Sequence, residues 1–321
     1  MSGAALNVLI VGAGGIGGYY GARLADAGHN LVLTARGRHL AAIQARGLEV
    51  MVEGETLRCR APAVDHATLI RKHRTTDFDL VIFTLKSTAT KQVLKELGSW
   101  LAQGDVPVLS LQNGVDNEVL IARRLGEARV LGGLAVRIGG HITEPGKVRA
   151  EGVAQVVVGG WPCMEQSHDC RRTVLSRLKK VFDAASIPTR VSDNIRYELW
   201  RKLVINNGVN PLSALTGLDT RSLTHHPDFS RIVHGMMAET VEASRADGVN
   251  LKSQDLDEMY ELIRSFNAIK TSMLVDKEKG RPLELDSISG AVLNRCQKLG
   301  IDAPYTRLVS ALLRVEGSQR L

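Results

Sequence analysis

The glycine-rich segment near the start of the chain constrains the fold more than any other feature. It reads 7-NVLIVGAGGIGGYYGARLADAGHN-30, an apolar strand pattern that enters a helical pattern through Gly12-x-Gly14-x-x-Gly17. In a strand–turn–helix unit that binds a dinucleotide, one glycine permits the tight turn, a second lets a pyrophosphate approach the backbone, and a third lets helix and strand pack closely. The helix start then offers N–H groups and a positive dipole to the phosphates. A turn with only a structural role is the alternative. The residues that we expect around the pyrophosphate are Gly12, Gly14, Gly15, Ile16 and Gly17.

The end of the second expected strand bears on which dinucleotide would bind. A site for NAD carries an Asp or Glu about 20 residues after the glycines, where it accepts the ribose 2′-hydroxyl. Here the chain reads 33-LTARGRHL-40, with Arg36 and Arg38 and no acid. A guanidinium binds a 2′-phosphate through charge-assisted hydrogen bonds, whereas a carboxylate would repel it. We therefore predict NADP (NADPH in its reduced form), with Arg36 as the contact. A solvated loop charge is the alternative for either arginine.

The first half of the chain alternates short apolar runs with helical patterns. Runs rich in β-branched residues suit strands buried on both faces, and hence a parallel sheet covered by helices. The expected strands are 7–11, 31–34, 79–85, 106–111, 129–136, 154–160 and 186–191. The expected helices are 15–27, 88–101, 117–125 and 171–185. The turn-rich stretch 139–147, together with 154–160, predicts a small antiparallel extension.

The pattern changes at 192-SDNIRYELW-200, after which helical periodicity dominates. Interruptions fall at Pro211 and within 215–219, 224–228, 278–282 and 299–304, where Gly, Pro and Asp are concentrated. We therefore expect an α/β fold with two domains. Residues 1–191 would form a Rossmann-like, NADP-binding domain with a parallel sheet, and residues 192–321 an all-helical substrate and catalytic domain.

Two further expected strands end in polar residues. The strand 79–85 runs into Lys86-Ser87, and 106–111 runs into Gln112-Asn113-Gly114. Ligands of open α/β sheets lie beyond the carboxyl ends of the strands. Lys86 would therefore project towards the adenosine side of a cofactor and Asn113 towards its nicotinamide side. The spacing alone fits a helix cap at Ser87 and a simple turn after Asn113 equally well.

The first helix of the second half carries an unexplained polar stripe. In 198-ELWRKLVINNGVNPLSALTG-217, Lys202, Asn206 and Asn210 lie four residues apart, on one face of a helix. Asn and Gly each cost a helix about 0.5–1 kcal/mol relative to Ala, so a helix built only for stability would not carry three Asn and a Gly within five residues. Because a residue before proline avoids helical geometry, Pro211 predicts a bend or a helix end at Asn210.

Composition excludes several classes of protein. Of the 321 residues, 44% are apolar and 23% charged, which is ample material for packed cores. The net charge of +7 favours anionic ligands, but with 4% aromatic residues and scattered basic ones we expect no nucleic-acid surface. The four cysteines lack metal-ligand spacing, and no stretch approaches the ~20 apolar residues of a membrane span. The start lacks the basic region of a signal peptide. We expect a cytoplasmic protein without a metal, and a homodimer is one open possibility.

Taken together, these segments resemble the ketopantoate reductase family (2-dehydropantoate 2-reductases) over almost the whole chain. The resemblance rests on the glycine segment, Arg36, 84-TLKS-87, 112-QNG-114, 196-RYELWRKLVINNGVNPLSALTG-217 and 271-TSMLVD-276 followed by Glu284. The two C-terminal blocks are the specific ones, since glycine loops occur in many unrelated oxidoreductases. The resemblance implies a Rossmann domain followed by a helical domain, with the active site in the cleft between them. It also implies NADPH-dependent reduction of ketopantoate, a 2-oxo acid, to pantoate in the pathway to pantothenate and coenzyme A.

The resemblance gives the polar stripe a role. It implies that Lys202 is the catalytic lysine, whose ammonium stabilises the negative charge that grows on the keto oxygen and delivers a proton to it. Burial would suit this role by lowering the pKa of the lysine. Asn206 and Asn210 correspond to asparagines that orient the substrate, and Asn113 to one that contacts cofactor and substrate.

Two residues near the C-terminus are assigned in the same way. Glu284 matches the acidic residue of the family, which accepts a hydrogen bond from the substrate hydroxyl and helps to position the lysine. Ser272 matches the substrate-binding serine. By position alone, Glu284 also fits an acid favoured by the dipole at a helix start, and Asp286 fits that description equally well.

One position departs from the family pattern and leaves alternatives open. Many relatives have a histidine after the turn in 145-PGKVRAEG-152, where this chain places Ala150, with Arg149 beside it. If this position borders the active site, the substrate is another small 2-oxo acid, as in a paralogue or an opine-like dehydrogenase. An NADP-binding sensor without turnover is a further class, although a sensor would not need the intact set of site residues. Nucleic-acid binding is the last class, and no base-reading pattern is visible.

Overall fold

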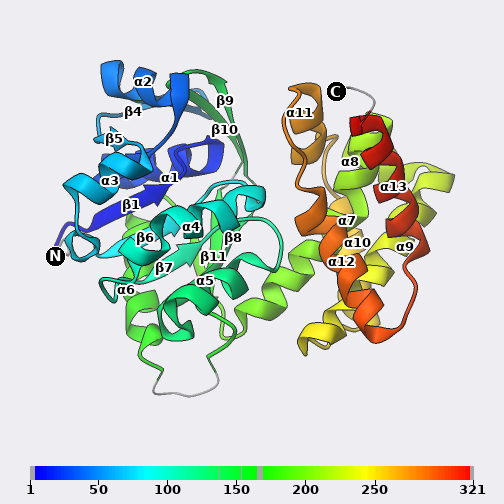
Figure 1. Cartoon of the computed structure of the whole chain (residues 1–321). Coiled ribbons are helices and arrows are strands. Elements are labelled where there is room, and N and C mark those ends of the chain that lie inside the picture. Colours follow the sequence, from blue (N-terminus) through cyan, green and yellow to red (C-terminus); the bar gives the residue numbers. More distant parts are fainter. Residues whose placement is uncertain (1–3, 137, 153, 165–168, 319–321) are drawn as a thin grey trace. The chain divides into compact units, whose positions relative to one another are not determined.

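The computed structural model describes residues 4–136, 138–152, 154–164 and 169–318. By its internal contacts the chain divides into two compact units. The first comprises Met1–Gln112 and Asn117–Ile195, and the second comprises Asn113–Asp116 and Arg196–Leu321. Figure 1 shows that the strands lie in the first, which we call the α/β unit, and that the second, the helical unit, is built of helices. The expected succession of an α/β part and a helical part is confirmed.

The α/β unit is built on a sheet of eight strands in the order β12-β11-β8-β7-β6-β1-β2-β5. Their bounds are β1 Asn7–Val11, β2 Asn30–Thr34, β5 Ala63–Val64, β6 Leu80–Phe83, β7 Val108–Ser110, β8 Val130–Val136, β11 Gln155–Gly160 and β12 Thr189–Val191. Neighbouring strands are parallel from β8 through β5, whereas β11 runs antiparallel to β8. The strand order reverses at β1, between β2 and β6, which is where ligands of such sheets bind. The expected Rossmann-like sheet is confirmed.

The sheet is buried on both faces because apolar residues occupy both sides of its strands. In β1, Val8 and Ile10 belong to a core cluster that includes residues of three helices, while Leu9 and Val11 alternate to the other face and are also buried. The helices of this unit are α1 Gly15–Asp26, α2 Gly37–Arg46, α3 His66–Lys72, α4 Thr90–Leu101, α5 Asn117–Leu125 and α6 Arg171–Ala184. Helices α1, α2 and α6 contribute side chains to the core cluster on the first face.

A second sheet of four strands, in the order β4-β3-β10-β9, covers the other side of α1. Its strands are β3 Leu48–Val52, β4 Glu55–Cys59, β9 Gly139–Glu144 and β10 Lys147–Glu151. Val50 and Val148 enter the same core cluster as Tyr19 and Tyr20 of α1. The expected antiparallel extension is divided between the two sheets. The stretch 139–147 pairs within this second sheet, whereas 154–160 contributes β11 to the main one.

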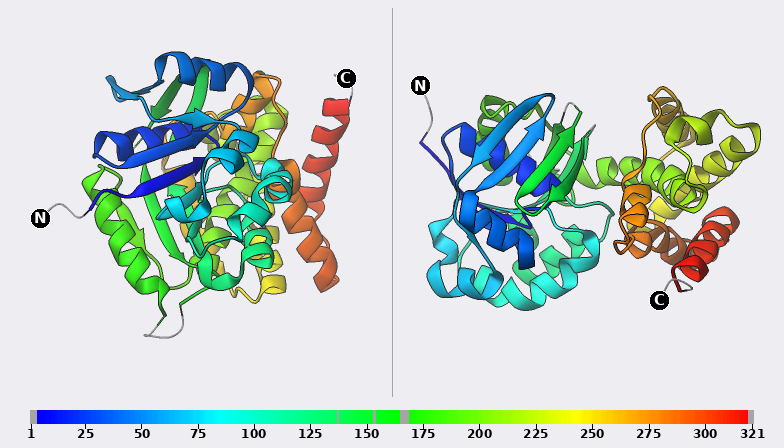
Figure 2. Two further views of the ribbon diagram at one scale, coloured as in Figure 1. Left: turned by 60° about the vertical axis from the view of Figure 1, so that its left-hand side comes forward. Right: turned by 90° about the horizontal axis from the view of Figure 1, so that it is seen from above.

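Four of the expected interruptions, 215–219, 224–228, 278–282 and 299–304, fall at boundaries between helices of the helical unit. Its helices are α7 Ile195–Thr216, α8 Thr220–His225, α9 Pro227–Ser244, α10 Ser253–Arg264, α11 Ser272–Glu278, α12 Leu285–Leu299 and α13 Pro304–Ser318. Gly217 and Gly300 follow α7 and α12 with φ of 76° and 68°, a left-handed conformation that glycine adopts without strain. Figure 2 shows α13 (red) along one side of this unit, where it packs on α9 and α12. Among the described residues, no helix is long and apolar enough to cross a membrane.

Candidate active site

The glycine loop between β1 and α1 has the geometry that its spacing predicts. Gly12 has φ of 101°, and a Cβ there would lie 3.0 Å from Leu85. A Cβ on Gly14 would meet nothing within 4 Å, so this side of the loop is open to a ligand. A Cβ on Gly17 would lie 2.2 Å from Thr84 Oγ1, because the helix start packs directly on the strands. The three glycines thus permit the turn, leave space for a ligand and allow close packing, in that order.

The start of α1 is suited to an anion. The first helical hydrogen bond runs from Gly18 N–H to Gly14 O, so the amides of Gly15, Ile16 and Gly17 precede the hydrogen-bonded ladder of the helix. The first turn contains no acidic residue, and its N-cap is a glycine without a side chain. Gly15 packs so closely on β9 that a Cβ would lie 2.0 Å from Gly140 O. A phosphate at this helix start would meet partial positive charge and no competing carboxylate from the first turn.

His39 anchors the glycine loop, which the sequence did not indicate. Its Nδ1 accepts the N–H of Gly146 at 3.0 Å, so Nε2 carries the proton and donates to Ala13 O at 2.7 Å. The ring therefore joins the loop after β1 to the turn between β9 and β10. A histidine one turn into a surface helix offers no local signal for this role, because both of its partners are backbone groups far along the chain.

Arg36 and Lys86 follow strands on either side of β1. Arg36 is the exposed N-cap of α2, just after β2, and Lys86 is exposed just after β6. Both strands pair with β1, so these side chains share one sheet edge with the glycine loop. Hydrogen bonds from His66 and Gln92, together with the charge of Arg36, lower the pKa of the Glu96 carboxyl. The last residue of β2 is Thr34, whose hydroxyl accepts a hydrogen bond from the N–H of Gly12 at 2.9 Å. The strand therefore does not end in the acid that is typical of an NAD site.

Lys202, Asn206 and Asn210 lie on one face of α7, as their spacing predicts. Lys202 and Asn206 are half-buried and Asn210 is buried. The prediction at Asn210 was a bend or a helix end, and the helix end was wrong, because α7 continues through Pro211 to Thr216. Pro211 removes one backbone donor from the helix interior, at a cost of about 3 kcal/mol in an isolated helix. Packing of α7 in the centre of the unit outweighs that local preference.

The other polar residue of this helix, Asn207, serves the fold. Its fully buried amide donates to Thr240 Oγ1 on α9 and Thr306 Oγ1 on α13, both at 3.0 Å, while its oxygen accepts from Ser289 on α12 at 2.9 Å. The adjacent Gly208 gives α9 room, since a Cβ there would lie 2.5 Å from Met237. The polar residues of 205-INNGVN-210 therefore lie on two different faces of α7. Asn207 and Gly208 pack α7 against α9, α12 and α13. Asn206 and Asn210 have no part in these contacts and are candidates for a substrate-binding site.

Glu284 and Asn113 are brought together within the helical unit. Asn113 follows β7, and its Nδ2 donates to Glu284 Oε2 at 3.3 Å. Glu284 is the N-cap of α12 but makes no capping hydrogen bond through its side chain, and it is only 3% exposed. Asp286, in the first turn of the same helix, is instead exposed and pairs with Arg314. Asp286 is therefore the ordinary helix-start acid, and Glu284 is held in a different environment.

Ser272 is the first residue of α11 and is exposed. The N-cap of this helix is the buried Thr271, whose hydroxyl accepts the N–H of Leu274 at 3.2 Å. Because Thr271 satisfies the helix start, the fold does not require the Ser272 hydroxyl as a cap.

A buried arginine fixes the short segment that carries Asn113. Arg295 on α12 pairs with Asp116 at 2.5 Å and with Asp247 at 3.0 Å, and its guanidinium lies 5.8 Å from the centre of the Trp200 ring. Burial disfavours the charged guanidinium, but the hydrogen bonds to Asp116 and Asp247 outweigh this effect and raise the pKa of Arg295. The segment Asn113–Asp116 is therefore held by α12 at both ends. Sequence patterns do not reveal this pairing, because its partners are 179 residues apart.

Comparison with known families matches most of the chain to one of them. Residues 8–162 match the family described as ketopantoate reductase PanE/ApbA, and residues 194–316 match the C-terminal part of the same family. The chain belongs to the ketopantoate reductase family. The resemblance inferred from the sequence is thereby confirmed, and with it the assignment to the oxidoreductases.

Curated relatives of this ketopantoate reductase family member align over nearly their full length. The 2-dehydropantoate 2-reductase of Mesorhizobium japonicum is 32% identical, with 96% of this chain and 97% of the relative aligned. That of Pyrococcus horikoshii is 28% identical, with 98% of each chain aligned.

Solved structures show the same fold. A ketopantoate reductase family structure from Ralstonia eutropha JMP134 superposes with a TM-score of 0.85 at 30% identity, covering 98% of this chain and 99% of that one. D-mandelate dehydrogenase, solved with NADH and anilino(oxo)acetate, has a TM-score of 0.88 at 22% identity, with 98% and 99% covered. At the lower identity the likeness extends to the fold alone.

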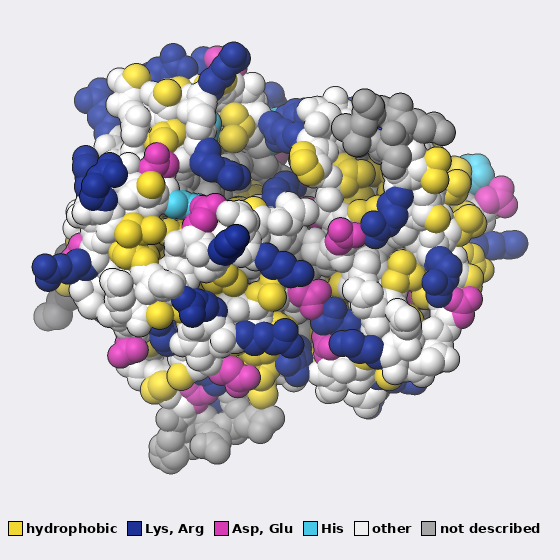
Figure 3. Space-filling model, in the orientation of Figure 1, with side chains coloured by type: hydrophobic (Ala, Val, Ile, Leu, Met, Phe, Trp, Pro, Cys, Tyr) yellow, Lys and Arg dark blue, Asp and Glu magenta, His cyan; other side chains and the backbone are white. Residues whose placement is uncertain are grey.

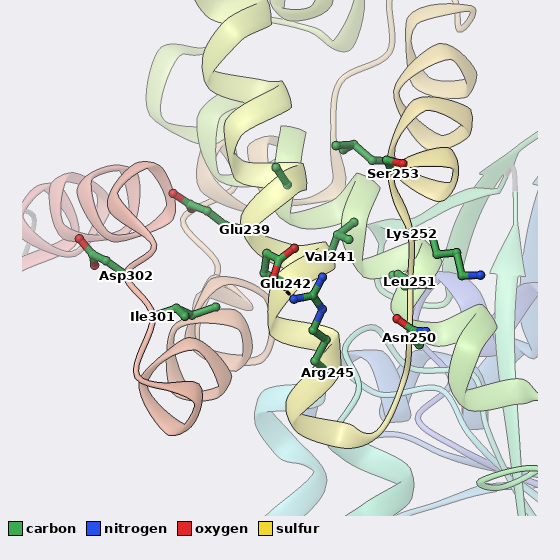
Figure 4. A pocket seen from close by; sticks show the side chains of 12 residues that line it. Glu239, Val241, Glu242, Arg245, Asn250, Leu251, Lys252, Ser253, Ile301 and Asp302 are labelled. Carbon is green, nitrogen blue, oxygen red and sulfur yellow. Dashed lines mark ion pairs between the residues drawn. The ribbon is translucent and has the colours of Figure 1, made fainter.

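One hollow of the helical unit holds none of the expected site residues. It measures about 650 Å³ and lies between α9, the segment 250–253 and the turn at 301–302 (Figure 4). Its acids serve the fold, since Glu242 pairs with Arg245 at 2.7 Å and the Glu239 carboxylate accepts the N–H groups of Tyr305 and Thr306 at the start of α13. We therefore do not assign the reductase site to this hollow.

Proposed function

We propose that the chain is an NADPH-dependent reductase that converts 2-dehydropantoate (ketopantoate) to pantoate, for pantothenate and coenzyme A synthesis. The observation that carries the proposal is the hydrogen bond from Asn113 to the buried carboxylate of Glu284. It joins the strand-end asparagine and the helix-start acid that such a reductase would use on one substrate. The half-buried Lys202 supports the proposal, because it lies on α7 in the same unit with Asn206 and Asn210 on its face.

The residues at the sheet edge fit a dinucleotide. The open side of Gly14 and the acid-free start of α1 would hold the pyrophosphate, with Gly12, Gly15, Ile16 and Gly17 forming the rest of the loop. The absence of an acid at the end of β2 and the presence of Arg36 favour a ribose 2′-phosphate, hence NADPH over NADH. Lys86 adds positive charge at the same edge. When bound, NADPH would supply the hydride for the keto carbon.

The chain supplies the proton and the orientation. The Lys202 ammonium would stabilise the negative charge that develops on the keto oxygen and would donate a proton to that oxygen, which completes the alcohol. Solvent then returns the proton to the lysine. Asn206 and Asn210 would orient the substrate through neutral donors and acceptors, which adds no charge that would compete with the lysine. Glu284 would accept a hydrogen bond from the substrate hydroxyl. Ser272 would donate a hydrogen bond to the carboxylate or the hydroxyl of the substrate.

The departure at Ala150 gives no reason to prefer another substrate. Ala150 is buried in the core cluster of the second sheet, and the neighbouring Arg149 is exposed and paired with Glu151 at 2.7 Å. In β10 the two side chains alternate between core and solvent, as a strand requires. An alanine in this core position has a packing role.

Initial rates of NADPH oxidation with a panel of 2-oxo acids test the proposal. Ketopantoate should give the highest kcat/KM, and NADH should support less than about one tenth of the NADPH rate, the difference that one charge-assisted contact provides. A higher kcat/KM with another oxo acid would transfer the proposal to the alternative reductase. Tight NADPH binding without reduction of any acid would support a sensor and refute the enzyme.

A further inference from the structure

The segment Asn113–Asp116 packs directly on the start of α12. Gly114 has φ of 97°, a conformation that favours glycine, and a Cβ there would lie 2.9 Å from the backbone oxygen of Ser287. The preceding residue, Asn113, donates to Glu284 at 3.3 Å. Glu284 and Ser287 are three residues apart, which is about one turn of the helix. The backbone of the segment therefore approaches the same turn of α12 that receives the Asn113 amide.

The end of the segment is bound to α12 about three turns further on. Arg295 lies eleven residues after Glu284, so both are on one face of the helix, about 16 Å apart along its axis. The three steps from Asn113 to Asp116 reach at most ~11 Å. The long side chain of Arg295 bridges the remainder, with Nη1 and Nη2 donating to the two oxygens of Asp116 at 3.1 and 2.5 Å. Both ends of the segment are thus fixed to one helix.

The guanidinium of Arg295 binds two carboxylates through different edges. Asp116 takes the edge of Nη1 and Nη2, whereas Asp247 accepts from Nε at 3.2 Å and from Nη2 at 3.0 Å. Asp247 ends the short helical turn Arg245–Asp247 between α9 and α10, which carries none of the expected site residues. The two acids therefore form ion pairs of the same kind, but only Asp116 belongs to the segment of Asn113.

Burial distinguishes this cluster from ion pairs at the surface. Basic and acidic side chains lie interspersed over the visible face of the molecule in Figure 3, and exposed pairs of such residues contribute little because solvent competes for both partners. The side chain of Arg295 is only 9% exposed, and its guanidinium lies 5.8 Å from the centre of the Trp200 ring. A buried guanidinium between fixed partners has few other positions, so it holds Asp116 in one place.

We propose that Asp116 is a positioning residue of the reductase, which acts through the Asn113 amide. The inference rests on the proposed function, in which Asn113 and Glu284 contact the substrate. While Arg295 holds Asp116, the short connection keeps the Asn113 amide within hydrogen-bond distance of the buried carboxylate. Without this ion pair, the segment loses its anchor at the far end, and the amide moves away from Glu284 for part of the time.

A double-mutant cycle between Asp116 and Asn113 tests the proposal, with kcat/KM measured for the oxo acid that the unaltered chain reduces best. Asp116→Ala should lower kcat/KM by about 10-fold or more, the effect of one charge-assisted hydrogen bond. In the Asn113→Ala chain the same change should lower kcat/KM by less than about twofold, because the amide that Asp116 positions is already absent. Asp116→Asn keeps an oxygen that accepts from Arg295 and should recover part of the loss.

Asp247→Ala is the matched control, because it removes the other carboxylate of the same guanidinium. It should lower the urea midpoint of unfolding, as Asp116→Ala does, but change kcat/KM by less than about threefold in either background. Hydrogen–deuterium exchange of the peptide that contains 113–116 supplies a readout without substrate. Exchange in this peptide should rise in Asp116→Ala and remain near that of the unaltered chain in Asp247→Ala.

Three outcomes would overturn the proposal. They are full activity of Asp116→Ala, equal losses from Asp116→Ala with and without the Asn113 amide, and equal losses from Asp116→Ala and Asp247→Ala. If the unaltered chain reduces no 2-oxo acid, the proposed function fails, and unchanged exchange in Asp116→Ala would then separately refute the positioning. Circular dichroism establishes that each variant is folded. If Asp116→Ala does not fold, Asp116→Ser takes its place with the same expectations.

Discussion

The side-chain amide of Asn113 donates to the carboxylate of Glu284 at 3.3 Å, so a strand-end turn and the start of α12 share one partly buried hydrogen bond. Glu284→Ala should lower kcat/KM for ketopantoate by about 100-fold, since it removes both the charge and the acceptor for Asn113. Glu284→Gln keeps an acceptor of the same shape, and its loss should be nearer to about 10-fold. Steady-state kinetics with each variant measure this difference.

Asp286→Asn is the control for this prediction, because Asp286 is an exposed acid in the first turn of the same helix. Its variant should retain the activity of the unaltered chain. Equal losses of kcat/KM for the variants of Glu284 and Asp286 would mean that any change at the start of α12 impairs the enzyme. That result would contradict a specific role for Glu284.

Arg36 should decide between NADPH and NADH. Arg36→Ala should raise the KM for NADPH by about 10- to 100-fold and leave that for NADH nearly unchanged, because only NADPH carries the 2′-phosphate that a guanidinium binds. Arg38→Ala, two residues further on and also exposed, is the matched control and should have a small effect. If Arg38→Ala has the larger effect, the contact is assigned to the wrong arginine.

Arg295 should be required for stability. Arg295→Met leaves Asp247 and Asp116 without their shared cation and should lower the free energy of unfolding by about 3–5 kcal/mol. Arg264→Met breaks an exposed pair with Glu261 and should cost less than about 1 kcal/mol. Urea unfolding followed by circular dichroism compares the two variants, and similar midpoints would contradict a stabilising role for the pairing of Arg295 with Asp116 and Asp247.

The cysteines should differ in reactivity as their burial differs. Cys170 is exposed, whereas burial raises the pKa of the Cys59 thiol and, with the charges of Glu239, Glu242 and Asp302, raises that of Cys296 to about 11. N-ethylmaleimide should label Cys170 first at neutral pH. The native state binds the Cys296 proton more tightly than the unfolded chain does. This contribution to stability is therefore present below the ordinary thiol pKa and declines as the pH rises towards about 11. Peptide mapping that finds Cys296 labelled as fast as Cys170 would contradict this ordering.

The parts of the fold that sequence patterns predict are those set by local rules. The loop from Gly12 to Gly17 follows from the backbone demands of a strand–turn–helix unit, and the helix ends at Gly217, Pro227 and Gly300 follow from turn chemistry. The second sheet was not predicted correctly, because β3 pairs with β10 about a hundred residues later in the chain, and no local pattern records that partner. Pro211 was misjudged for a related reason, since tertiary packing keeps α7 helical against the local preference.

The candidate site likewise has features that local sequence rules predict and features that only the structure reveals. The spacing of Lys202, Asn206 and Asn210 places them on one face, but only the structure separates them from Asn207, which the fold uses. Position alone did not distinguish Glu284 from Asp286, because both are acids at one helix start. Burial and the contact with Asn113 distinguish them.

Turnover of ketopantoate by Lys202→Ala tests the central claim most directly. The loss of NADPH absorbance should be followed under saturating conditions for the unaltered chain, for this variant, and for Lys252→Ala as a control lysine beside the hollow of Figure 4. The account predicts that Lys202→Ala lowers kcat by about 10²–10⁴-fold, the contribution of a proton donor in the transition state, while NADPH binding and the Lys252→Ala rate stay unchanged. A kcat within about tenfold of the unaltered chain, a loss of only ~1.4 kcal/mol in transition-state stabilisation, would contradict the assignment of Lys202 as the proton donor.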